Sequence, residues 1–174
     1  MIEDLILFAL ATRGEMSIRL EKVDIQQLIS QAVNGAAAKA EERGVTVTYT
    51  AGPNLPQVQA DPEKIGWVLN QLLDNGIKFT SSGGSVVARA KEESPRFVSV
   101  SVADTGIGIP SNRIHEIFEP FHQLDGSSTR HHGGTGLGLS LVRQIVEAHG
   151  SMLDVQSSEG KGSVFKFPLL SLRD

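Results

Sequence analysis

A glycine-rich stretch, Gly133-Gly134-Thr135-Gly136-Leu137-Gly138-Leu139-Ser140, precedes the most regular apolar pattern of this chain. The pattern has helical spacing, ends at Gly150, and consists of Leu137, Leu141, Val142, Ile145 and Val146. A glycine run that opens a helix favours anion binding, because glycine lets a ligand approach the backbone and the first N–H groups of a helix are unpaired. A tight turn into a packed helix explains the same residues, so this stretch alone assigns no function.

Two familiar phosphate-binding motifs are excluded. A Gly-Lys-Ser/Thr sequence is missing from the chain, so the stretch is not a P-loop. Residues 125–132 (DGSSTRHH) are polar and cannot form the apolar strand that precedes a dinucleotide-binding glycine motif.

The composition is that of a globular domain. The 174 residues suffice for one domain with a good core, and 40% of them are hydrophobic. A net charge of −4 gives no electrostatic footprint for nucleic acid. The chain has no cysteine, which excludes disulfides, thiolate metal sites and a cysteine nucleophile and agrees with a cytosolic location.

The apolar patterns predict alternating helices and strands. Helices are expected over 1–13, 25–43 (capped by Asp24), 62–79 (started by Asp61-Pro62), 111–117 (capped by Ser111) and 137–149. Strands are expected over 17–23, 45–50, 58–60, 85–91, 97–103, 151–157 and 162–170. The first helix has an apolar stripe that either docks on the domain or belongs to a longer helix: Ile2, Leu5, Ile6, Ala9 and Leu10.

Two stretches carry polar residues in positions that suggest a site. Gln71, Asn75 and Lys78 share one face of the 62–79 helix, and Gly76 lies inside that helix, where it costs about 1 kcal/mol relative to alanine. Some neighbouring group is therefore expected to approach the backbone at Gly76. Asp104 ends a strand and is followed by two glycines, which suits a carboxylate over a cavity floor and equally a plain turn.

Four motifs in a fixed order resemble the histidine-kinase and gyrase-type ATP-binding families. They are Asn75-Gly76-Ile77-Lys78-Phe79 (N box), Asp104-Thr105-Gly106-Ile107-Gly108 (first glycine box), Phe118-Glu119-Pro120-Phe121 (F box) and Gly134-Thr135-Gly136-Leu137-Gly138-Leu139 (second glycine box). The resemblance extends from about residue 23 to residue 170. It implies an α+β fold, a two-layer sandwich whose mixed, mostly antiparallel sheet is covered on one face by helices.

The resemblance also implies roles for matching residues. Asp104 would accept a hydrogen bond from the adenine amino group of ATP, and Asn75 would ligate Mg²⁺. Lys78 would contact phosphate. Further nucleotide-binding residues are expected at Phe79, Gly106, Gly108, Ile109, Phe121, Arg130, Gly134, Thr135, Gly136, Leu137, Gly138, Leu139 and Gln71. Residues 123–133 would be a mobile loop over the nucleotide.

Departures from the motifs of these families indicate which of their reactions the chain performs. Gyrase-type relatives carry a catalytic glutamate where this chain has Gln71, which cannot act as a base. A phosphoacceptor histidine followed by an acidic residue is missing ahead of residue 61, and His115 and His149 are expected to be structural. The sequence therefore predicts residues 1–14 as the end of a dimerisation and histidine-phosphotransfer helix, and 15–174 as the catalytic domain.

The leading hypothesis is the ATP-binding catalytic domain of a sensor histidine kinase. Its partners would be its own dimerisation domain in a homodimer and a response regulator receiver domain, with no nucleic acid. It would lie in the cytosol and reach a membrane only through other segments. A non-catalytic nucleotide sensor of the same fold remains an alternative, and Gln71 argues against a third, a gyrase-type ATP hydrolase.

Overall fold

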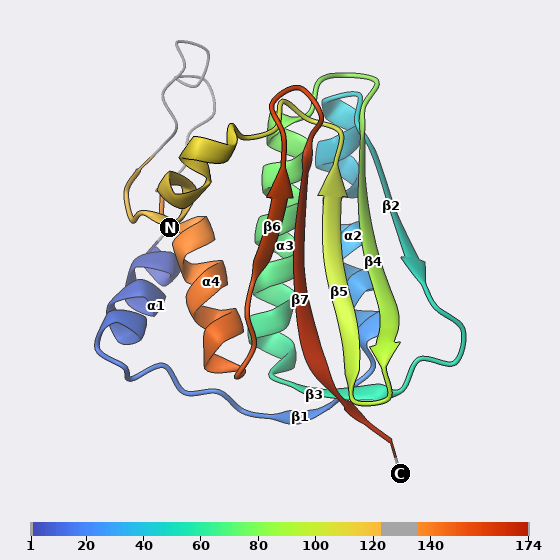
Figure 1. Cartoon of the computed structure of the whole chain (residues 1–174), viewed down its shortest axis with the longest axis vertical. Coiled ribbons are helices and arrows are strands. Elements are labelled where there is room, and N and C mark those ends of the chain that lie inside the picture. The colour runs from blue at the N-terminus through green and yellow to red at the C-terminus, as the bar shows by residue number, and fades with distance from the viewer. Residues whose placement is uncertain (1, 123–135, 174) are drawn as a thin grey trace.

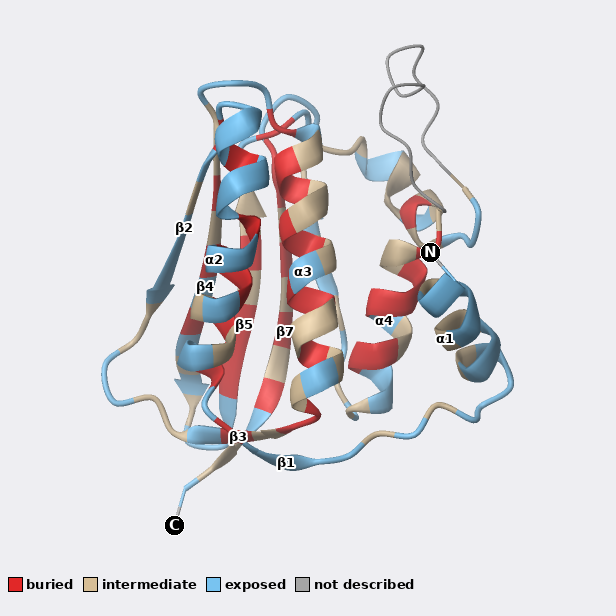
Figure 2. Ribbon diagram, turned by 180° about the vertical axis from the view of Figure 1, so that it is seen from behind, coloured by how far each residue is buried: buried red, intermediate tan, exposed pale blue. Residues whose placement is uncertain are grey.

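The computed structural model describes residues 2–122 and 136–173, which form two layers. The helices lie on one side of a twisted sheet (Figures 1 and 2). In chain order, the described elements are α1 (Ile2–Thr12), β1 (Glu21–Val23), α2 (Ile25–Glu42), β2 (Thr46–Ala51), β3 (Gln57–Ala60), α3 (Pro62–Phe79), β4 (Ser85–Ser94), β5 (Phe97–Asp104), the 3-10 helix η1 (Ser111–Phe118), α4 (Gly138–Ala148), β6 (Asp154–Ser157) and β7 (Ser163–Leu172).

The sheet is mixed but mostly antiparallel, as expected. Among the described residues seven strands pair in the order β1-β3-β7-β5-β4-β2, and β6 pairs with the first half of β7. The β2–β4 pair is parallel and the other pairs are antiparallel. Strands β5 and β7 therefore lie at the centre, and the predicted α+β sandwich is confirmed.

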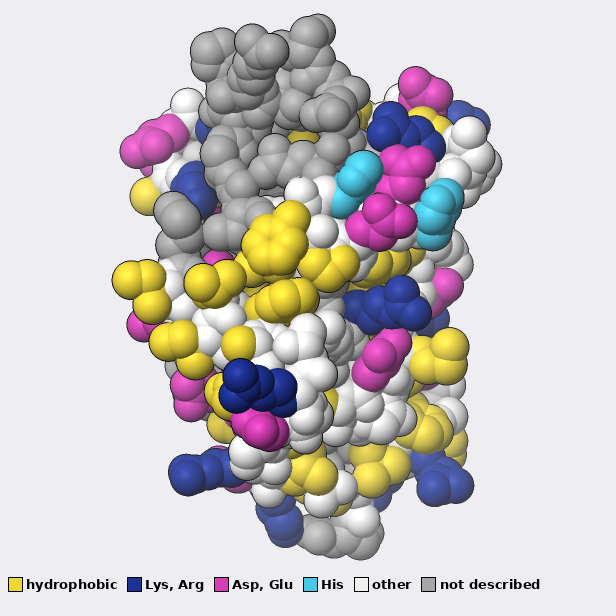
Figure 3. All heavy atoms as spheres, turned by 90° about the vertical axis from the view of Figure 1, so that its left-hand side faces the viewer, with side chains coloured by type: hydrophobic (Ala, Val, Ile, Leu, Met, Phe, Trp, Pro, Cys, Tyr) yellow, Lys and Arg dark blue, Asp and Glu magenta, His cyan; other side chains and the backbone are white. Residues whose placement is uncertain are grey.

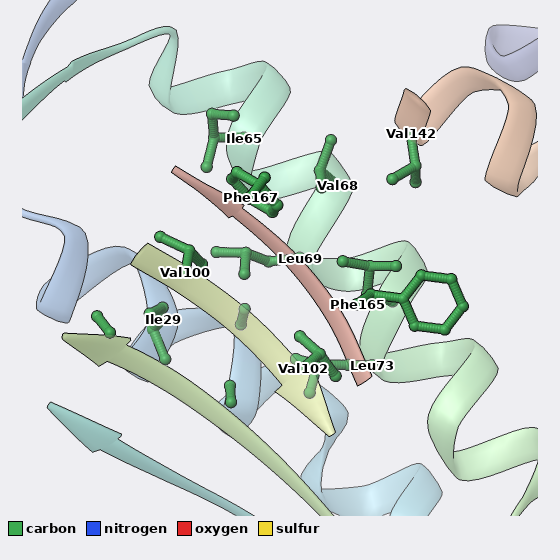
Figure 4. Close-up of a cluster of buried hydrophobic side chains, with 14 of the residues drawn as sticks. Ile29, Ile65, Val68, Leu69, Leu73, Val100, Val102, Val142, Phe165 and Phe167 are labelled. Atoms are coloured by element: carbon green, nitrogen blue, oxygen red, sulfur yellow. The ribbon is translucent and has the colours of Figure 1, made fainter. Parts of the chain in front are cut away.

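The core lies between the central strands and α3. Leu69 and Leu73 of α3 are fully buried and face Val100 and Val102 of β5 and Phe167 of β7 (Figure 4). Because side chains alternate along a strand, Asp104 lies on the same, helix-facing side of β5 as Val100 and Val102. The Asp104 carboxylate thus lies at the end of the strand face that packs against α3.

Helix starts follow the sequence closely, except at Ser111. Asp24 accepts a hydrogen bond from the Gln27 N–H (3.1 Å), and Asp61 accepts one from the Lys64 N–H (3.1 Å), so both predicted caps are confirmed. The expected cap at Ser111 is wrong, because η1 is a 3-10 helix that begins after Pro110 with no side-chain cap. The strand expected over 17–23 is shorter, since only Glu21–Val23 finds a partner, in β3.

Helix α1 docks on a different face from the one its apolar stripe predicts. Leu7 and Phe8 are partly buried toward α4 and Phe121, and the Phe8 and Phe121 rings meet edge to face at 5.8 Å. The predicted stripe is exposed instead: Ile2, Leu5, Ile6, Ala9 and Leu10. Hydrophobic side chains are accordingly gathered on this side of the molecule (Figure 3). None of the described helices has the length and apolar character that crossing a membrane requires.

A buried polar node joins three segments at the end of the molecule opposite the glycine loops. The Asp61 carboxylate accepts hydrogen bonds from the N–H groups of Arg19 (2.9 Å) and Lys64, and the Asp61 N–H donates to Nε2 of His149 (3.0 Å). The His149 Nδ1 therefore carries the hydrogen and donates it to the Ile145 carbonyl (2.7 Å). His149 is structural, as expected.

The Asp61 carboxylate makes stability sensitive to acid. Burial alone raises its pKa, but hydrogen bonds from the Arg19 and Lys64 N–H groups and the Lys64 charge outweigh burial and lower that pKa. A lowered pKa contributes stability above the unfolded value, and that contribution is lost as the pH falls through the folded value. Asp61→Ala is expected to lower the free energy of unfolding by about 1–3 kcal/mol at pH 7, and by progressively less in acid.

Urea denaturation over a pH series tests this expectation. Asp24→Ala is the matched control, because Asp24 also caps a helix but is exposed and makes one such bond; its loss should be about 0.5–1 kcal/mol. Equal losses for the two variants, or a loss at Asp61 that does not shrink in acid, would contradict the role given to the buried carboxylate.

Candidate functional site

Asp104 lies at the end of the central strand β5, where the chain turns into the loop 105–109. Its Oδ1 accepts a hydrogen bond from the Gly106 N–H at 2.9 Å. Burial raises the pKa of the Asp104 carboxyl, although backbone hydrogen bonds from Gly106 and Ser163 oppose the rise. Asp104 is thus a partly desolvated acceptor that holds its charge at a cost, as in sites that bind a donor.

The end of α3 packs against Asp104 through a glycine. A Cβ built on Gly76 would lie 3.0 Å from Val86 Cγ1 and 3.6 Å from the Cβ of Asp104. This close approach accounts for a glycine inside the helix, as the sequence suggested. It also places Asn75, which is partly buried, on the turn of α3 that adjoins Asp104.

The loop 105–109 is held between α3 and the β6–β7 turn. The Ile107 N–H donates to the Phe79 carbonyl (3.1 Å), and the Gly160 N–H donates to the Ile107 carbonyl (2.7 Å). A Cβ on Gly106 would lie 2.5 Å from the Phe79 carbonyl oxygen. One on Gly108, where φ is +68°, would lie 1.9 Å from the Ser158 carbonyl oxygen. Both glycines are therefore required by contacts within the protein.

Lys78 lies on the last turn of α3 in a cationic setting. Burial, and then the nearby charges of Lys39 and Arg43, lower the pKa of its ammonium, and Asp74 opposes them. Its Nζ lies 5.5 Å from the centroid of the Phe79 ring. Phe79 is 37% exposed, so its ring lies at the surface of the site rather than in the core.

The start of α4 closes the other side of the site. Leu137 is buried and occupies the N-cap position, and among the described residues no side chain caps this helix end. The first N–H groups of α4 are therefore suited to an anion. A Cβ on Gly138 would lie 2.7 Å from Oε1 of Gln71, so the glycine lets the Gln71 carboxamide reach the helix start.

The F-box residue Phe121 is joined to Gly136 across residues 123–135. The Phe121 N–H donates to the Gly136 carbonyl (3.1 Å), and both residues have positive φ, +62° and +72°. Phe121 is 63% exposed and contacts Phe8 of α1. The predicted contacts at Arg130, Gly134 and Thr135, and the loop 123–133, lie outside the described residues.

The structure brings most of the predicted residues together around α3. From Gly76, which touches Asp104, to Gln71, which touches Gly138, is about 7.5 Å along the helix axis. Ile109 and Leu139 are partly buried and pack against the core at the edges of this arrangement. The acceptor Asp104 and the cation Lys78 lie near the end of α3, and a helix start without a side-chain cap lies beside Gln71. This arrangement suits a ligand with a polar donor group and an anionic tail.

The sequence reasoning missed the serines that lie beside Asp104. Ser163 of β7 is the register partner of Asp104, and Ser157 of β6 is the register partner of Ser163. The sequence pattern places Ser163 only within a final hairpin strand. Pairing the strand that ends at Asp104 with the one that begins at Ser163 could have located it, but that pairing joins segments about 60 residues apart.

Comparisons with known proteins agree with this geometry. Residues 60–173 match the family model described as "Histidine kinase-, DNA gyrase B-, and HSP90-like ATPase". The chain is 34% identical to the circadian input-output histidine kinase CikA of Synechococcus elongatus, covering 95% of this chain and 22% of that protein. It is 35% identical to the alginate biosynthesis sensor protein KinB of Pseudomonas aeruginosa, covering 95% of this chain and 27% of that protein.

A solved structure shares the fold over almost the whole chain. The crystal structure of full-length ShkA in complex with AMPPNP superimposes with a TM-score of 0.88 at 29% identity, covering 99% of this chain and 36% of that one. The chain thus spans about a fifth to slightly more than a third of these relatives. It belongs to the family of histidine kinase-, DNA gyrase B- and HSP90-like ATPases, and within it to the ATP-binding catalytic domains of histidine kinases.

Proposed function

We propose that this chain binds Mg-ATP and donates the γ-phosphoryl group to a histidine on a dimerisation domain. The observation that carries the proposal is the placement of α3 between the Asp104 carboxylate and the uncapped start of α4. An adenine amino group matches the partly desolvated acceptor, and a triphosphate matches the positive dipole end and the N–H groups at the start of α4. The complex of the similar protein ShkA with AMPPNP supports the same ligand class.

Individual residues then have distinct tasks. Asp104 accepts from the adenine amine, while Gly106, Gly108 and Ile109 shape the loop beside the base. Phe79 covers the ligand from α3, and Phe121 borders it from the F box. Lys78 and the α4 start, with Gly136, Leu137, Gly138 and Leu139, hold the phosphates. Arg130, Gly134 and Thr135 are proposed to complete that contact.

Asn75 fits a magnesium ion carried by the nucleotide. Its partly buried side chain makes no hydrogen bond among the described residues, and its amide oxygen is a hard ligand. Magnesium keeps several waters and binds phosphates, so one protein ligand suffices. When bound, the ion would neutralise phosphate charge, and the chain's own residues would orient the triphosphate.

Hydrolysis lacks a base at the position that adjoins the phosphate end. Gln71 reaches the start of α4, yet a carboxamide cannot take a proton from water. Transfer to a histidine needs no such base from α3 because imidazole is itself nucleophilic. We infer that the domain transfers its phosphoryl group rather than hydrolysing ATP.

The exposed stripe of α1 suits a second helix. We propose that residues 1–14 end a dimerisation helix and that 15–174 form the catalytic domain. The phosphoacceptor histidine would lie on that dimerisation domain in a homodimer, and a response regulator receiver domain would be the next acceptor. The cytosol is the proposed location.

The proposal predicts phosphate transfer only when a histidine is supplied. Incubated with γ-labelled Mg-ATP, the 174-residue chain should bind nucleotide, acquire no label and release little phosphate. Fusing a histidine kinase dimerisation domain ahead of Met1 should produce label on its histidine, and Asn75→Ala in that fusion should remove it. Binding without transfer in the fusion would favour a nucleotide sensor, and rapid phosphate release by the chain alone would favour a hydrolase.

A further inference from the structure

Three polar side chains form a row across the end of the sheet. Asp104 of β5, Ser163 of β7 and Ser157 of β6 are successive register partners and lie on the helix-facing side of adjacent strands. Ser163 is 6% exposed, and its hydroxyl lies 2.7 Å from that of Ser157. The two serines therefore extend the acceptor site beyond Asp104, and their hydroxyl hydrogens decide what that extension can recognise.

The contacts of Ser157 fix the direction of this hydroxyl pair. The Ser157 Oγ accepts a hydrogen bond from the Ile109 N–H (2.8 Å), and it lies 3.0 Å from the Gly162 carbonyl oxygen, which can only accept. Ser157 has one hydroxyl hydrogen, and only that hydrogen can fill the contact with the carbonyl. The hydrogen in the serine–serine contact must then come from Ser163.

Ser163 is left without a hydrogen for any ligand. Its hydroxyl hydrogen is committed to Ser157, so its oxygen offers any further partner only lone pairs, as does the carboxylate of its register partner Asp104. Two neighbouring acceptors match an exocyclic amino group. They meet a 6-oxo group with repulsion and leave it unpaired, and an unpaired polar group in a buried site is costly.

We propose that Ser157 is a positioning residue that makes Ser163 an obligate acceptor, so that the site selects a 6-amino purine over a 6-oxo purine. This inference rests on the proposed function, because it assumes that a purine nucleotide occupies the site beside Asp104. Ser157 acts through Ser163. Removing the Ser157 hydroxyl frees the Ser163 hydrogen, which can then donate to a 6-oxo group.

The experiment compares Mg-ATP with Mg-ITP, which carries oxygen in place of the 6-amino group, by calorimetric titration of the 174-residue chain. Wild type should prefer ATP. Ser157→Ala should lower the ATP-to-ITP affinity ratio at least about fivefold, mainly by raising ITP affinity, and Ser157→Thr should restore the ratio. Since both ligands bind the same folded fraction, a loss of stability in a variant cancels from the ratio.

Two further variants separate positioning from packing. In a Ser163→Ala background, Ser157→Ala should leave the ratio unchanged, because its effect passes through Ser163. Ser101→Ala is the matched control: Ser101 lies on β5 one residue from Val102, on the opposite face of the sheet. A Ser157→Ala ratio equal to that of Ser101→Ala overturns the inference, as does an effect that persists without Ser163. A folded wild-type chain that binds neither nucleotide overturns the proposed function itself.

Discussion

Asp104→Asn is expected to lower ATP affinity about 10- to 100-fold and at the same time to stabilise the nucleotide-free chain at neutral pH. The affinity falls because the adenine amine loses a charge-assisted bond of about 1.5–3 kcal/mol. The stability rises because burial raises the pKa of the Asp104 carboxyl, so the ionised form is disfavoured in the folded state and a neutral amide is not. Asparagine also retains an oxygen for the Gly106 N–H.

The pH dependence follows from the same shift. For a carboxyl whose folded pKa is raised, the destabilisation is fully present above that pKa and vanishes below the unfolded value. The stability difference between variant and wild type should therefore shrink in acid. ATP affinity of the wild type should fall as the pH is lowered through the raised pKa, because protonation removes the negative charge that strengthens the bond from the adenine amine. The variant's affinity should change little.

Calorimetric titration and thermal unfolding at several pH values measure both effects. Asp154→Asn is the control, because Asp154 is an exposed carboxylate of β6 away from the row that ends at Asp104. Unchanged affinity in Asp104→Asn would remove Asp104 from the base site. Weakened affinity with reduced stability in the free chain would show instead that the carboxylate holds the loop 105–109 in place.

Local chemistry made part of this fold predictable from sequence. Asp61-Pro62 is a cap followed by proline at the first helical position, and α3 begins at Pro62. Gly76 could be recognised as a point of close approach, because a glycine inside a strong helix needs a reason outside the helix. Asp104 could be placed at a strand end because the alternation of apolar and polar residues stops there and two glycines follow.

Partners that are remote in sequence decided what could not be predicted. The docked face of α1 depends on α4 and Phe121, which lie more than 100 residues later, so the most apolar stripe of the helix does not identify the face that docks. The serine row depends on the register of β7 against both β5 and β6. The turn residues between β6 and β7 also do not indicate, from sequence alone, that this turn packs on the loop 105–109 after Asp104.

That packing sets the last expectation: Gly108→Ala should destabilise the chain by at least about 3 kcal/mol and abolish most ATP binding. At Gly108 two penalties coincide. Alanine at φ +68° costs about 1–2 kcal/mol in backbone strain. Its Cβ would also lie 1.9 Å from the Ser158 carbonyl oxygen, and the backbone must move to relieve that contact. The movement would separate the β6–β7 turn from the loop 105–109.

Gly160→Ala separates the two penalties. Gly160 lies in the same β6–β7 turn with φ +77°, but a Cβ there meets nothing within 4 Å, so only the strain of about 1–2 kcal/mol should appear. Urea denaturation gives the free energies of unfolding. Titration at low temperature without denaturant, where each variant is folded, gives the ATP affinity. If the two variants lose the same stability, the turn yields without cost and does not support the loop. If Gly108→Ala is the less stable but binds ATP normally, the loop and the turn hold the fold together without shaping the base site.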